Sequence, residues 1–441
     1  MYSEEDILRM IEEEDVEFIR LQFTDMFGVL KNVAVTASQI AHVLKHGCMF
    51  DGSSIDGYAR EEESDMYLKP DLDTFVIFPW RPQAGKVARL ICNVYKPDGT
   101  RFPGDPRQVL RTQMERANAL GYTFDVGPEC EFFLFHTDEN GLPTTEPGDD
   151  GGYFDLGPTD LGENVRRDIV MNLENMGYQV EGSHHETAPG QHEVDFRYGE
   201  ALSMADKIMT LKLAVKTLAR RHGLWATFMP KPRNDCAGSG MHINMSLMKG
   251  DHNIFGDAAD PDGLSETARH FMAGIMAHAR GMAAVTNPLV NSYKRFQPGF
   301  EAPIYIAWAR QNRSPLVRIP AGSVGNTRVE LRSADSAANP YLALAVCLAA
   351  GLDGIEKKMM PPAAITGNPN NMTDEERAAA GIQSLPRSLK EALEEMEKDT
   401  VVRETLGDYI TDRYIRAKKQ EWEEYAQYVS DWEINRYLGK Y

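Results

Sequence analysis

The chain has 441 residues, of which 47 are Lys or Arg and 66 are Asp or Glu, so its formal net charge is −19. At about 150 residues per domain, the length predicts two or three domains. A hydrophobic content of 42% is enough to build large cores, which excludes a disordered protein. The surplus of acid argues against a protein that binds nucleic-acid phosphates.

The five cysteines lie far apart and form no Cys-x-x-Cys pair. This spacing predicts reduced thiols in a cytoplasmic protein, rather than a disulfide framework or a zinc site. The first twenty residues are acidic and amphipathic, unlike a signal peptide. The longest apolar stretch, residues 341–352, is too short and too rich in small residues to span a bilayer.

The first hundred residues indicate a unit that is mainly β. Ser3 can cap a short amphipathic helix. Apolar residues alternate on both sides of a turn, which predicts a hairpin over 16–35, and a second strand pair is predicted at 74–78 and 87–95. A cluster of Pro, Gly and Asp at 97–106 ends this unit.

Helices and strands mix in the remainder of the chain. Helices are predicted at 107–120, 164–176, 202–222, 264–286, 340–358 and 388–437. Strands are predicted at 122–135 and near Val194, Ile243 and Val329. The segment 367–384, which begins with Asn and Pro, is predicted to be a surface loop.

Four predicted strands place ionisable side chains on one face and apolar side chains on the other, because successive residues of a strand point to opposite faces. The polar faces are formed by Glu129 and Glu131, by Glu193 and Asp195, by His242, Asn244 and Ser246, and by Arg328, Glu330 and Arg332. Any one of these strands alone is most simply a half-buried strand with a solvated face. Solvated faces usually carry Thr, Lys, Ser and Gln, however, whereas these carry mainly Glu, His and Arg.

Together with a glutamate in the run 184–186, these strands supply five carboxylates and one imidazole. The six residues are Glu129, Glu131, Glu186, Glu193, Glu330 and His242. Carboxylates that lie close together repel one another unless a cation lies between them. Because oxygen ligands select Mg²⁺ or Mn²⁺ over Zn²⁺, the set predicts two such ions.

A basic stretch follows in this acidic chain. Between residues 288 and 335 seven basic residues face three acidic ones, and six of the seven are Arg. The planar fork of Arg matches carboxylate and phosphate oxygens, although salt bridges with the acidic remainder are an alternative. A metal cluster beside an arginine cluster favours phosphoryl transfer to or from an anionic substrate. The sequence contains no P-loop motif.

Several longer motifs occur in a fixed order along the chain. They are Asp51-Gly52-Ser53-Ser54-Ile55, Glu129-x-Glu131, Lys231-Pro232, Gly238-Ser239-Gly240-Met241-His242, Asn291-Ser292-Tyr293-Lys294-Arg295, Asn312-Arg313-Ser314, Glu330-x-Arg332 and Asn339-Pro340-Tyr341-Leu342. Their order and spacing resemble type I glutamine synthetase, from about residue 14 to the C-terminus.

The resemblance implies an α+β fold: an N-terminal β-grasp domain at 14–98, and a catalytic domain at 105–441 with a curved antiparallel sheet flanked by helices. It implies that ATP, L-glutamate and ammonia give L-glutamine, ADP and phosphate through γ-glutamyl phosphate. Active sites would lie between neighbouring subunits of a homo-dodecamer made of two stacked hexamers.

The resemblance also implies roles for individual residues. One Mg²⁺ or Mn²⁺ ion would be bound by Glu131, Glu186 and Glu193, and the ion that bridges the phosphates by Glu129, His242 and Glu330. Glutamate would be bound at Ala237, Gly238, Arg295, Glu301 and Arg332. ATP would be bound at Glu181, Asn244, Ser246, Arg313 and Arg318.

Three of the implied residues take part in catalysis. Arg313 would stabilise the transferring phosphoryl group as a fixed positive charge. Asp51 of a neighbouring subunit would help to take a proton from ammonium. Glu301 would lie on a flap that closes over the intermediate, since an acyl phosphate exposed to water would be hydrolysed.

The sequence departs from the family pattern at two places. Ala237 stands where Asn is usual, so glutamate would be contacted either by the main chain or by a side chain that is absent here. No tyrosine lies between Tyr341 and Tyr409, which predicts the shorter subtype, controlled by feedback and protein partners rather than by adenylylation. Arg60 matches a position tied to feedback inhibition, and a surface salt bridge is the alternative.

Aromatic and apolar residues recur at helical spacing near the C-terminus, at Trp422, Tyr425, Val429 and Trp432. The pattern predicts either a helix packed on its own core or a subunit contact, which is the use that the family makes of this segment.

Three other functions compete with glutamine synthesis. A γ-glutamyl ligase of the same superfamily would use a larger amine, although the Asp51 loop favours ammonia. A non-catalytic structural or regulatory homologue should have lost metal ligands or Arg313, and all are present. A general metal-dependent kinase explains neither Glu301 nor the Asp51 loop.

Overall fold

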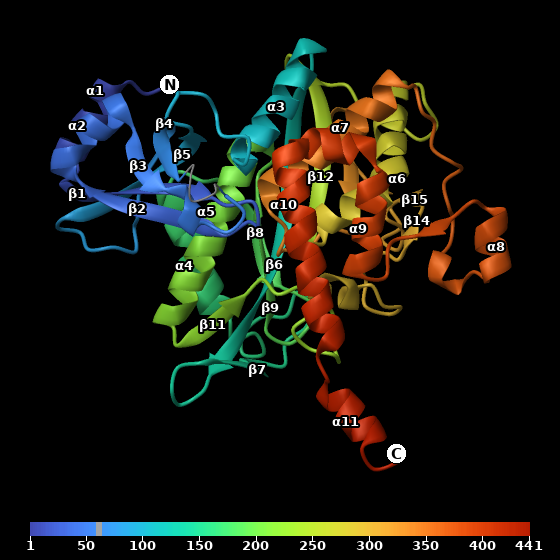
Figure 1. Ribbon diagram of the computed structural model, residues 1–441. Helices are drawn as coiled ribbons and strands as arrows, with labels where there is room; N and C mark the ends of the chain where they lie inside the picture. The colour runs from blue at the N-terminus through green and yellow to red at the C-terminus, as the bar shows by residue number, and fades with distance from the viewer. Residues whose placement is uncertain (59–63) are drawn as a thin grey trace.

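The computed structural model describes residues 1–58 and 64–441 (Figure 1). A small sheet with two helices forms the N-terminal part, and a larger sheet covered by helices forms the rest. The expected α+β class is therefore confirmed. Arg60, the proposed feedback residue, lies outside the described residues.

The N-terminal part consists of α1 (Glu4–Glu13), β1 (Val16–Thr24), β2 (Leu30–Thr36), α2 (Ala37–His46), β3 (Cys48–Asp51), β4 (Asp65–Ile77) and β5 (Lys86–Tyr95). The strand order in the described residues is β2-β1-β5-β4-β3, with β1 and β5 parallel and the other neighbours antiparallel. Ser3 caps α1 in a reciprocal capping box with Asp6. The predicted hairpin is confirmed, with Leu21 paired to Val33.

One strand of this sheet is much longer than predicted. β4 begins at Asp65, nine residues before the predicted start at Thr74. Its first half contains Lys69, Pro70 and Asp71, which hide the apolar alternation, and the register shifts between Asp71 and Val76. Pairing with β3 and β5 therefore determines this strand more than its own pattern does.

The larger part begins with α3 and is built on a second sheet. Its helices are α3 (Pro106–Ala119), α4 (Glu163–Asn175), α5 (Ala201–Arg221), α6 (Glu266–Thr286), α7 (Pro340–Glu356), α8 (Asp374–Ala379), α9 (Leu389–Lys398), α10 (Thr400–Gln427) and α11 (Asp431–Tyr437). Its longer strands are β6 (Thr123–Thr137), β7 (Pro143–Pro147), β8 (Val180–His185), β9 (Gln191–Phe196), β11 (Leu224–Thr227) and β12 (Met241–Lys249). The short strands are β10 (Gly199–Glu200), β13 (His252–Asn253), β14 (Tyr305–Ile306), β15 (Trp308–Arg310), β16 (Val317–Ile319), β17 (Val329–Leu331) and β18 (Gln383–Ser384).

The main path of the second sheet runs β15-β16-β17-β12-β6-β9-β8 in the described residues, and it is antiparallel except between β15 and β16. Its apolar face carries buried side chains such as Phe132 and Ile243, which share one core with Ile169 of α4 and Ile208 of α5. Helices thus cover one face of the sheet (Figure 1). The opposite face of the sheet carries the charged side chains.

The predicted surface loop 367–384 contains helix α8, which differs from the prediction. Thr373 caps this helix in a reciprocal capping box with Glu376, so the sequence did contain a start signal. Gly381, in the left-handed region at φ 66°, lies just beyond the helix.

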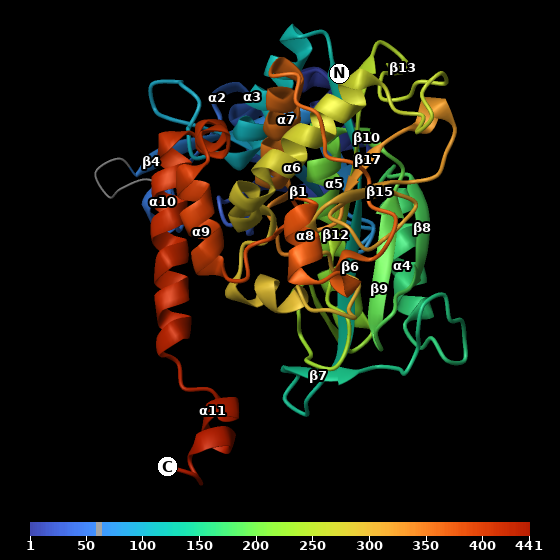
Figure 2. The same ribbon diagram turned by 90° about the vertical axis from the view of Figure 1, so that its right-hand side faces the viewer.

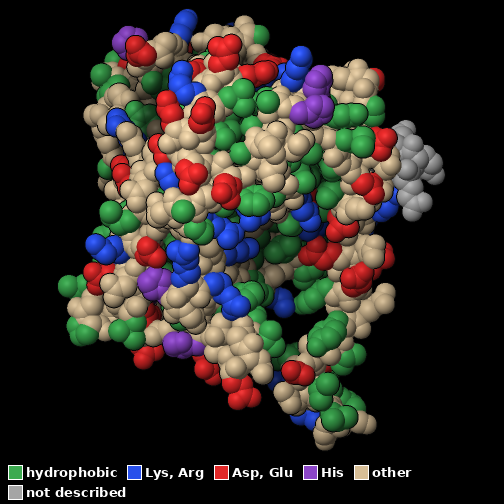
Figure 3. All heavy atoms as spheres, turned by 90° about the vertical axis from the view of Figure 1, so that its left-hand side faces the viewer, with side chains coloured by type: hydrophobic (Ala, Val, Ile, Leu, Met, Phe, Trp, Pro, Cys, Tyr) green, Lys and Arg blue, Asp and Glu red, His purple; other side chains and the backbone are tan. Residues whose placement is uncertain are grey.

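The C-terminal aromatic residues do not lie on a single helix. α10 ends at Gln427, and Ser430 starts α11 (Figure 2). Trp422 packs against the main core, whereas Tyr428 and Trp432 are 69% and 63% exposed. The segment protrudes from the body with hydrophobic side chains on its surface (Figure 3). Packing on the chain's own core therefore accounts only for Trp422.

Among the described residues, no helix is long and apolar enough to cross a membrane.

His278 joins three helices and predicts a pH effect on stability. From α6, its Nδ1 lies 2.8 Å from Asp399 Oδ2, at the start of α10, and its Nε2 lies 3.1 Å from Asp353 Oδ2 of α7. Burial lowers the pKa of His278, but the hydrogen bonds to both carboxylates outweigh it, so the pKa is raised. The contribution to stability is therefore fully present below about pH 6.5 and is lost as pH rises through the folded-state pKa.

We expect His278→Gln to lower the free energy of unfolding by about 1–3 kcal/mol at pH 5.5 and by less at pH 9. Urea unfolding at both pH values measures this difference. The exposed His252 supplies the matched control, and its Gln variant should follow the wild type at both values. A difference for His278→Gln that grows with pH would contradict the charged bridge.

Candidate functional site

The pairing register places the charged side chains of four strands on one face of the second sheet. His242 lies directly opposite Glu129, Glu129 lies opposite Asp195, and Glu131 lies opposite Glu193. Directly opposed residues share a face, with Cβ atoms about 5 Å apart. The alternation seen in separate segments therefore becomes a single acidic surface, called the acidic face below.

One cluster on this face consists of Glu129, His242 and Glu330, whose candidate ligand atoms all lie within 4.8 Å of one another. His242 Nδ1 lies 3.0 Å from a Glu129 carboxylate oxygen, and Asn244 Nδ2 donates to the other oxygen at 2.9 Å. Burial raises the pKa of Glu129, but the hydrogen bonds and nearby positive charge bring it to about 2. The carboxylate is thus held in its charged form, ready to bind a cation.

A second cluster consists of His184, Glu193 and Asp195. His184 Nε2 lies 3.2 Å from a Glu193 oxygen. Burial, and then the charges of nearby carboxylates, raise the pKa of Glu193 well above its usual range. Burial and the charge of Glu193 raise the pKa of Asp195 to about 9. A divalent cation would relieve this repulsion.

The predicted metal ligands Glu131, Glu186 and Glu193 lie less close together than the predicted ligands Glu129, His242 and Glu330. Glu131 accepts hydrogen bonds from the Gly240 amide at 2.8 Å and Gln191 Nε2 at 2.9 Å. Glu186 accepts one from the Thr187 amide, and burial together with the charge of Glu131 raises its pKa. Both glutamates belong to the same electrostatic group as Glu193, although the tight cluster within the described residues contains His184 and Asp195 instead.

The arginines border the acidic face through Glu330, which is only 1% exposed. Its carboxylate accepts from Arg332 Nη1 at 2.6 Å and from Arg318 Nη1 at 2.7 Å. The Nε atoms of both arginines are buried and have no hydrogen-bond partner within the described part of the chain. Arg295 is also buried, and it donates to the main-chain carbonyls of residues 332–334. These donors fit an anionic ligand.

Arg313 lies near both the acidic face and the predicted flap. Burial lowers the pKa of Arg313, but a hydrogen bond with Tyr153 and the charges of Tyr153, Glu330 and Glu301 raise it overall. Glu301 has a left-handed backbone at φ 59°, next to Gly299 at φ 91° and Phe300. Such a conformation is uncommon for a residue with a side chain and is typical of functional sites.

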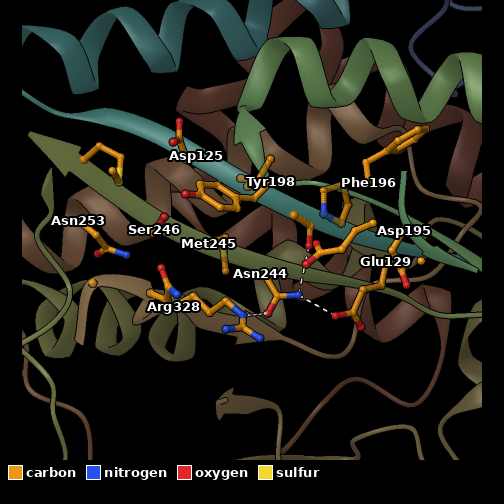
Figure 4. Close-up of a pocket in the computed structure, with 18 residues that line it drawn as sticks. Asp125, Glu129, Asp195, Phe196, Tyr198, Asn244, Met245, Ser246, Asn253 and Arg328 are labelled. Carbon is orange, nitrogen blue, oxygen red and sulfur yellow. Dashed lines mark hydrogen bonds between the residues drawn. The ribbon is translucent and has the colours of Figure 1, made fainter. Parts of the chain in front are cut away.

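A pocket of about 380 Å³ opens beside the first cluster (Figure 4). Three predicted ATP-binding residues line it, namely Glu181, Asn244 and Ser246. Arg328 Nε donates to Asn244 Oδ1 at 2.9 Å, which links the pocket wall to the Asn244–Glu129 hydrogen bond. The other two, Arg313 and Arg318, do not line this pocket in the described part of the chain. A phosphate-sized group at the Glu129 end would meet the acidic face and its arginines.

Asp51 lies apart from this face in the chain. It ends β3 of the N-terminal sheet, where it accepts hydrogen bonds from the Ser53 amide at 2.8 Å, the Ser53 hydroxyl at 2.6 Å and the Ser54 hydroxyl at 3.2 Å. Hydrogen bonds from Ser53 lower the pKa of Asp51. None of its hydrogen bonds within the described residues reaches the acidic face.

The loop that was predicted to bind glutamate is tightly packed at Gly238. A Cβ added at Gly238 would lie 2.1 Å from the carbonyl oxygen of Pro230, which accepts a hydrogen bond from the Ser239 amide. The side chain of Ala237 packs on an apolar cluster that includes Phe133 and Phe135. Because the Ala237 side chain packs on apolar residues, the main-chain alternative is favoured.

Some residues of the site were given no role in the predicted set. Alternation had already placed Asp195 and Arg328 on the strand faces of Glu193 and Glu330, but neither was predicted to bind a ligand. His184 of β8 lies directly opposite Glu193 of the neighbouring strand β9. Tyr153 belongs to a loop without a local pattern, and only tertiary packing brings it to Arg313.

Removing divalent metal should destabilise the protein. The clustered carboxylates repel one another, and a bound ion stabilises the folded state by about 2.7 kcal/mol at a concentration 100 times its Kd. We expect EDTA to lower the thermal midpoint of the wild type, and Mg²⁺ or Mn²⁺ to restore it. Glu129→Gln should reduce this response, whereas Asp168→Asn on the surface of α4 should retain it. If the thermal midpoint of Glu129→Gln responded to metal as strongly as that of the wild type, Glu129 would not be a metal ligand.

Comparisons with known proteins match both parts of the chain. The family model described as glutamine synthetase, beta-Grasp domain, matches residues 15–97, and that described as glutamine synthetase, catalytic domain, matches residues 103–437. A glutamine synthetase from Clostridium saccharobutylicum is 58% identical over 440 residues, covering 100% of this chain and 99% of that protein.

Solved structures agree with these matches. The structure titled "GmaS/ADP complex-Conformation 1" is 32% identical, with a TM-score of 0.89, over 98% of this chain and 99% of that chain. Glutamine synthetase from Plasmodium falciparum is 26% identical, also with a TM-score of 0.89, over 99% of each chain. The β-grasp and curved-sheet architecture and the full-length matches lead to one conclusion: the chain belongs to the glutamine synthetase family.

Proposed function

We propose that the acidic face of the second sheet is where this chain forms L-glutamine from L-glutamate, ammonia and ATP. The joint position of Glu129, His242 and Glu330 beside buried arginines carries the proposal. An ATP-dependent carboxylate–amine ligase is the activity that the family matches support.

The nucleotide would occupy the pocket next to Glu129, with Glu181, Asn244 and Ser246 at its walls. A related protein solved with ADP supports a nucleotide in this fold. Arg318 and Arg313 would face the phosphates, with Arg318 held by Glu330. Glutamate would bind along Gly238, Arg295 and Arg332, with Ala237 offering its main chain.

Divalent metal ions, when bound, would neutralise phosphate charge on the acidic face. We propose two ions per site: one held by Glu129, His242 and Glu330, and one held by Glu131, Glu186 and Glu193 with Asp195 nearby. The oxygen-rich donor set and the mutual repulsion of these carboxylates fit Mg²⁺ or Mn²⁺.

Arg313 would stabilise the γ-phosphoryl group as it passes to the γ-carboxylate oxygen of glutamate. Ammonia then attacks the carbonyl carbon, the bond from carbon to the phosphate oxygen breaks, and phosphate leaves. Asp51 of a neighbouring subunit would accept the proton of ammonium, and Glu301 would close the site against water.

The test is ATP-dependent product formation with Mg²⁺, glutamate and either ammonium or another amine, with the product identified by mass. We expect glutamine with ammonium. A γ-glutamyl amide formed only with a larger amine would support the related ligase activity instead. ATP-dependent turnover of neither kind in a metal-bound protein would indicate a non-catalytic homologue.

The shared site predicts complementation between two inactive variants. Asp51→Asn lacks the group donated to a neighbour, and Glu330→Gln lacks the acidic-face group, so each alone should be almost inactive. When both are co-expressed in equal amounts, about a quarter of the sites in a ring should combine two intact contributions. We expect activity near that fraction. Activity no higher than that of the single variants would contradict a site shared between subunits.

We also propose domain limits of 14–98 and 105–441, with α1 as an N-terminal extension packed on the first sheet. The exposed segment of α11 and its neighbours suits a contact in a homo-dodecamer. A cytoplasmic location, regulation by feedback at Arg60 and by protein partners, and the short subtype without an adenylylated tyrosine complete the proposal.

A further inference from the structure

A buried lysine outside the metal and arginine sets is anchored at the base of the flap. Lys231 is only 4% exposed. Its amide donates to Asn291 Oδ1 at 2.8 Å, and its carbonyl accepts from Asn291 Nδ2 at 2.9 Å. Asn291 lies in the short 3-10 helix Val290–Arg295, which leads directly into the flap. The main chain of Lys231 is thereby fixed to the segment from which the flap emerges.

The ammonium group of Lys231 reaches from this anchor to the flap itself. It donates a hydrogen bond to the Cys236 carbonyl, in the loop that leads to Ala237 and Gly238. It also lies 3.8 Å from the centre of the Phe300 ring. That distance is well inside the range of effective cation–π contacts, which strengthen when the cation is shielded from water. One side chain therefore joins the glutamate-binding loop to the flap.

The flap contains a non-glycine residue in the left-handed backbone region. Phe300 lies between Gly299 at φ 91° and Glu301 at φ 59°. A left-handed residue with a side chain persists only where surrounding contacts hold it. Within the flap, the Ala302 amide donates to the Phe300 carbonyl at 2.8 Å. The contact of Lys231 with the adjacent ring adds an attachment from outside the flap.

We propose that Lys231 is a positioning residue that holds the Glu301 flap closed by binding the face of the Phe300 ring. The proposal rests on the proposed function, because closure matters only if an acyl phosphate forms. With this contact the γ-glutamyl phosphate is shielded until ammonia arrives. Without it, water would attack the same carbonyl carbon, and glutamate and phosphate would be released at the cost of ATP.

The measurement is the ratio of ADP released to glutamine formed by the intact protein, at saturating Mg²⁺, ATP, glutamate and ammonium. We expect a ratio near one for the wild type and a rise of about twofold to tenfold in both Lys231→Met and Phe300→Leu. The double variant should show no further rise, because both changes remove one contact. Phe300→Tyr, which retains the ring, should keep the wild-type ratio.

Lys69→Met supplies a matched control, because its ammonium lies 4.4 Å over the Tyr95 ring in the N-terminal sheet. It should leave the ratio unchanged. A merely structural role for Lys231 would slow ADP and glutamine formation together without changing their ratio, and that result would overturn the proposal. So would additive effects in the double variant. Because Phe300 is only half-buried and its neighbours in the flap are exposed, its variants decide the matter even if Lys231→Met does not fold. A wild type that forms no glutamine would instead overturn the proposed function itself.

Discussion

A Glu330→Gln variant is expected to lose about 10²–10³-fold in kcat/KM for glutamate. Glu330 is the point where the first metal cluster meets the arginines, since its two oxygens accept from Arg332 at 2.6 Å and Arg318 at 2.7 Å. Glutamine in its place has one acceptor oxygen and no charge. One guanidinium would then lack its partner, and the cation site would lose a carboxylate.

The same substitution should also destabilise the fold, because breaking one side of a buried ion pair costs about 3–5 kcal/mol. Steady-state kinetics and urea unfolding measure the two effects. The control is Glu356→Gln, which removes a surface partner of Arg116 at 2.8 Å. It should change neither the free energy of unfolding nor the activation free energy by more than about 1 kcal/mol. An active Glu330→Gln variant with ordinary metal dependence would show that the arginines and the cation site are independent of this residue.

Gly238→Ala should have the second large effect, through steric overlap rather than charge. The added Cβ would lie 2.1 Å from the Pro230 carbonyl oxygen and 3.3 Å from Cγ of Arg295. Since the nearest atom belongs to the main chain, the loop must move. That movement disturbs the Gly240 amide bonded to Glu131 and the position of Arg295. We expect a fall of about 10²-fold in kcat/KM, because a displacement near 1 Å can have this effect.

Gly367→Ala is the control, since an added Cβ there meets nothing within 4 Å, and it should retain full activity. The loss in Gly238→Ala should be mainly in the KM for glutamate, because the loop is assigned to that substrate. If the loss were confined to the KM for ATP, the assignment of this loop to glutamate would be wrong.

Much of the fold was predictable because local signals agreed with tertiary structure. The capped first helix, the hairpin of β1 and β2, and helices α3 to α7 follow directly from capping and periodicity. β4 was predicted too short because charged residues and Pro70 interrupt its pattern. The region 388–437, predicted to be helical, contains three helices: α9 ends at Lys398 and α10 at Gln427, and Ser430 and Glu433 form the capping box that starts α11.

The strand faces of the site were predictable, but not their spatial grouping. Alternation placed Glu129, His242 and Glu330 each on the polar face of its own strand. The pairing register of β12 with β6 and β17 then determines which of these side chains lie next to each other. The group around Glu193 illustrates the limit. His184 approaches Glu193 through strand pairing, whereas Tyr153 approaches Arg313 from a loop of another part of the chain. Contacts of this kind depend on packing between distant parts of the chain, which cannot be read from the local pattern of polar and apolar residues.

We propose that the γ-phosphoryl group of ATP passes to the γ-carboxylate of glutamate on the acidic face before ammonia attacks. Glutamate labelled with ¹⁸O in its γ-carboxylate tests it directly. The attacking carboxylate oxygen remains on phosphorus when ammonia displaces phosphate, so each phosphate formed with glutamine should carry one ¹⁸O atom. Glutamine formed together with unlabelled phosphate would contradict the account, because the carboxylate oxygen would then never have bonded to phosphorus.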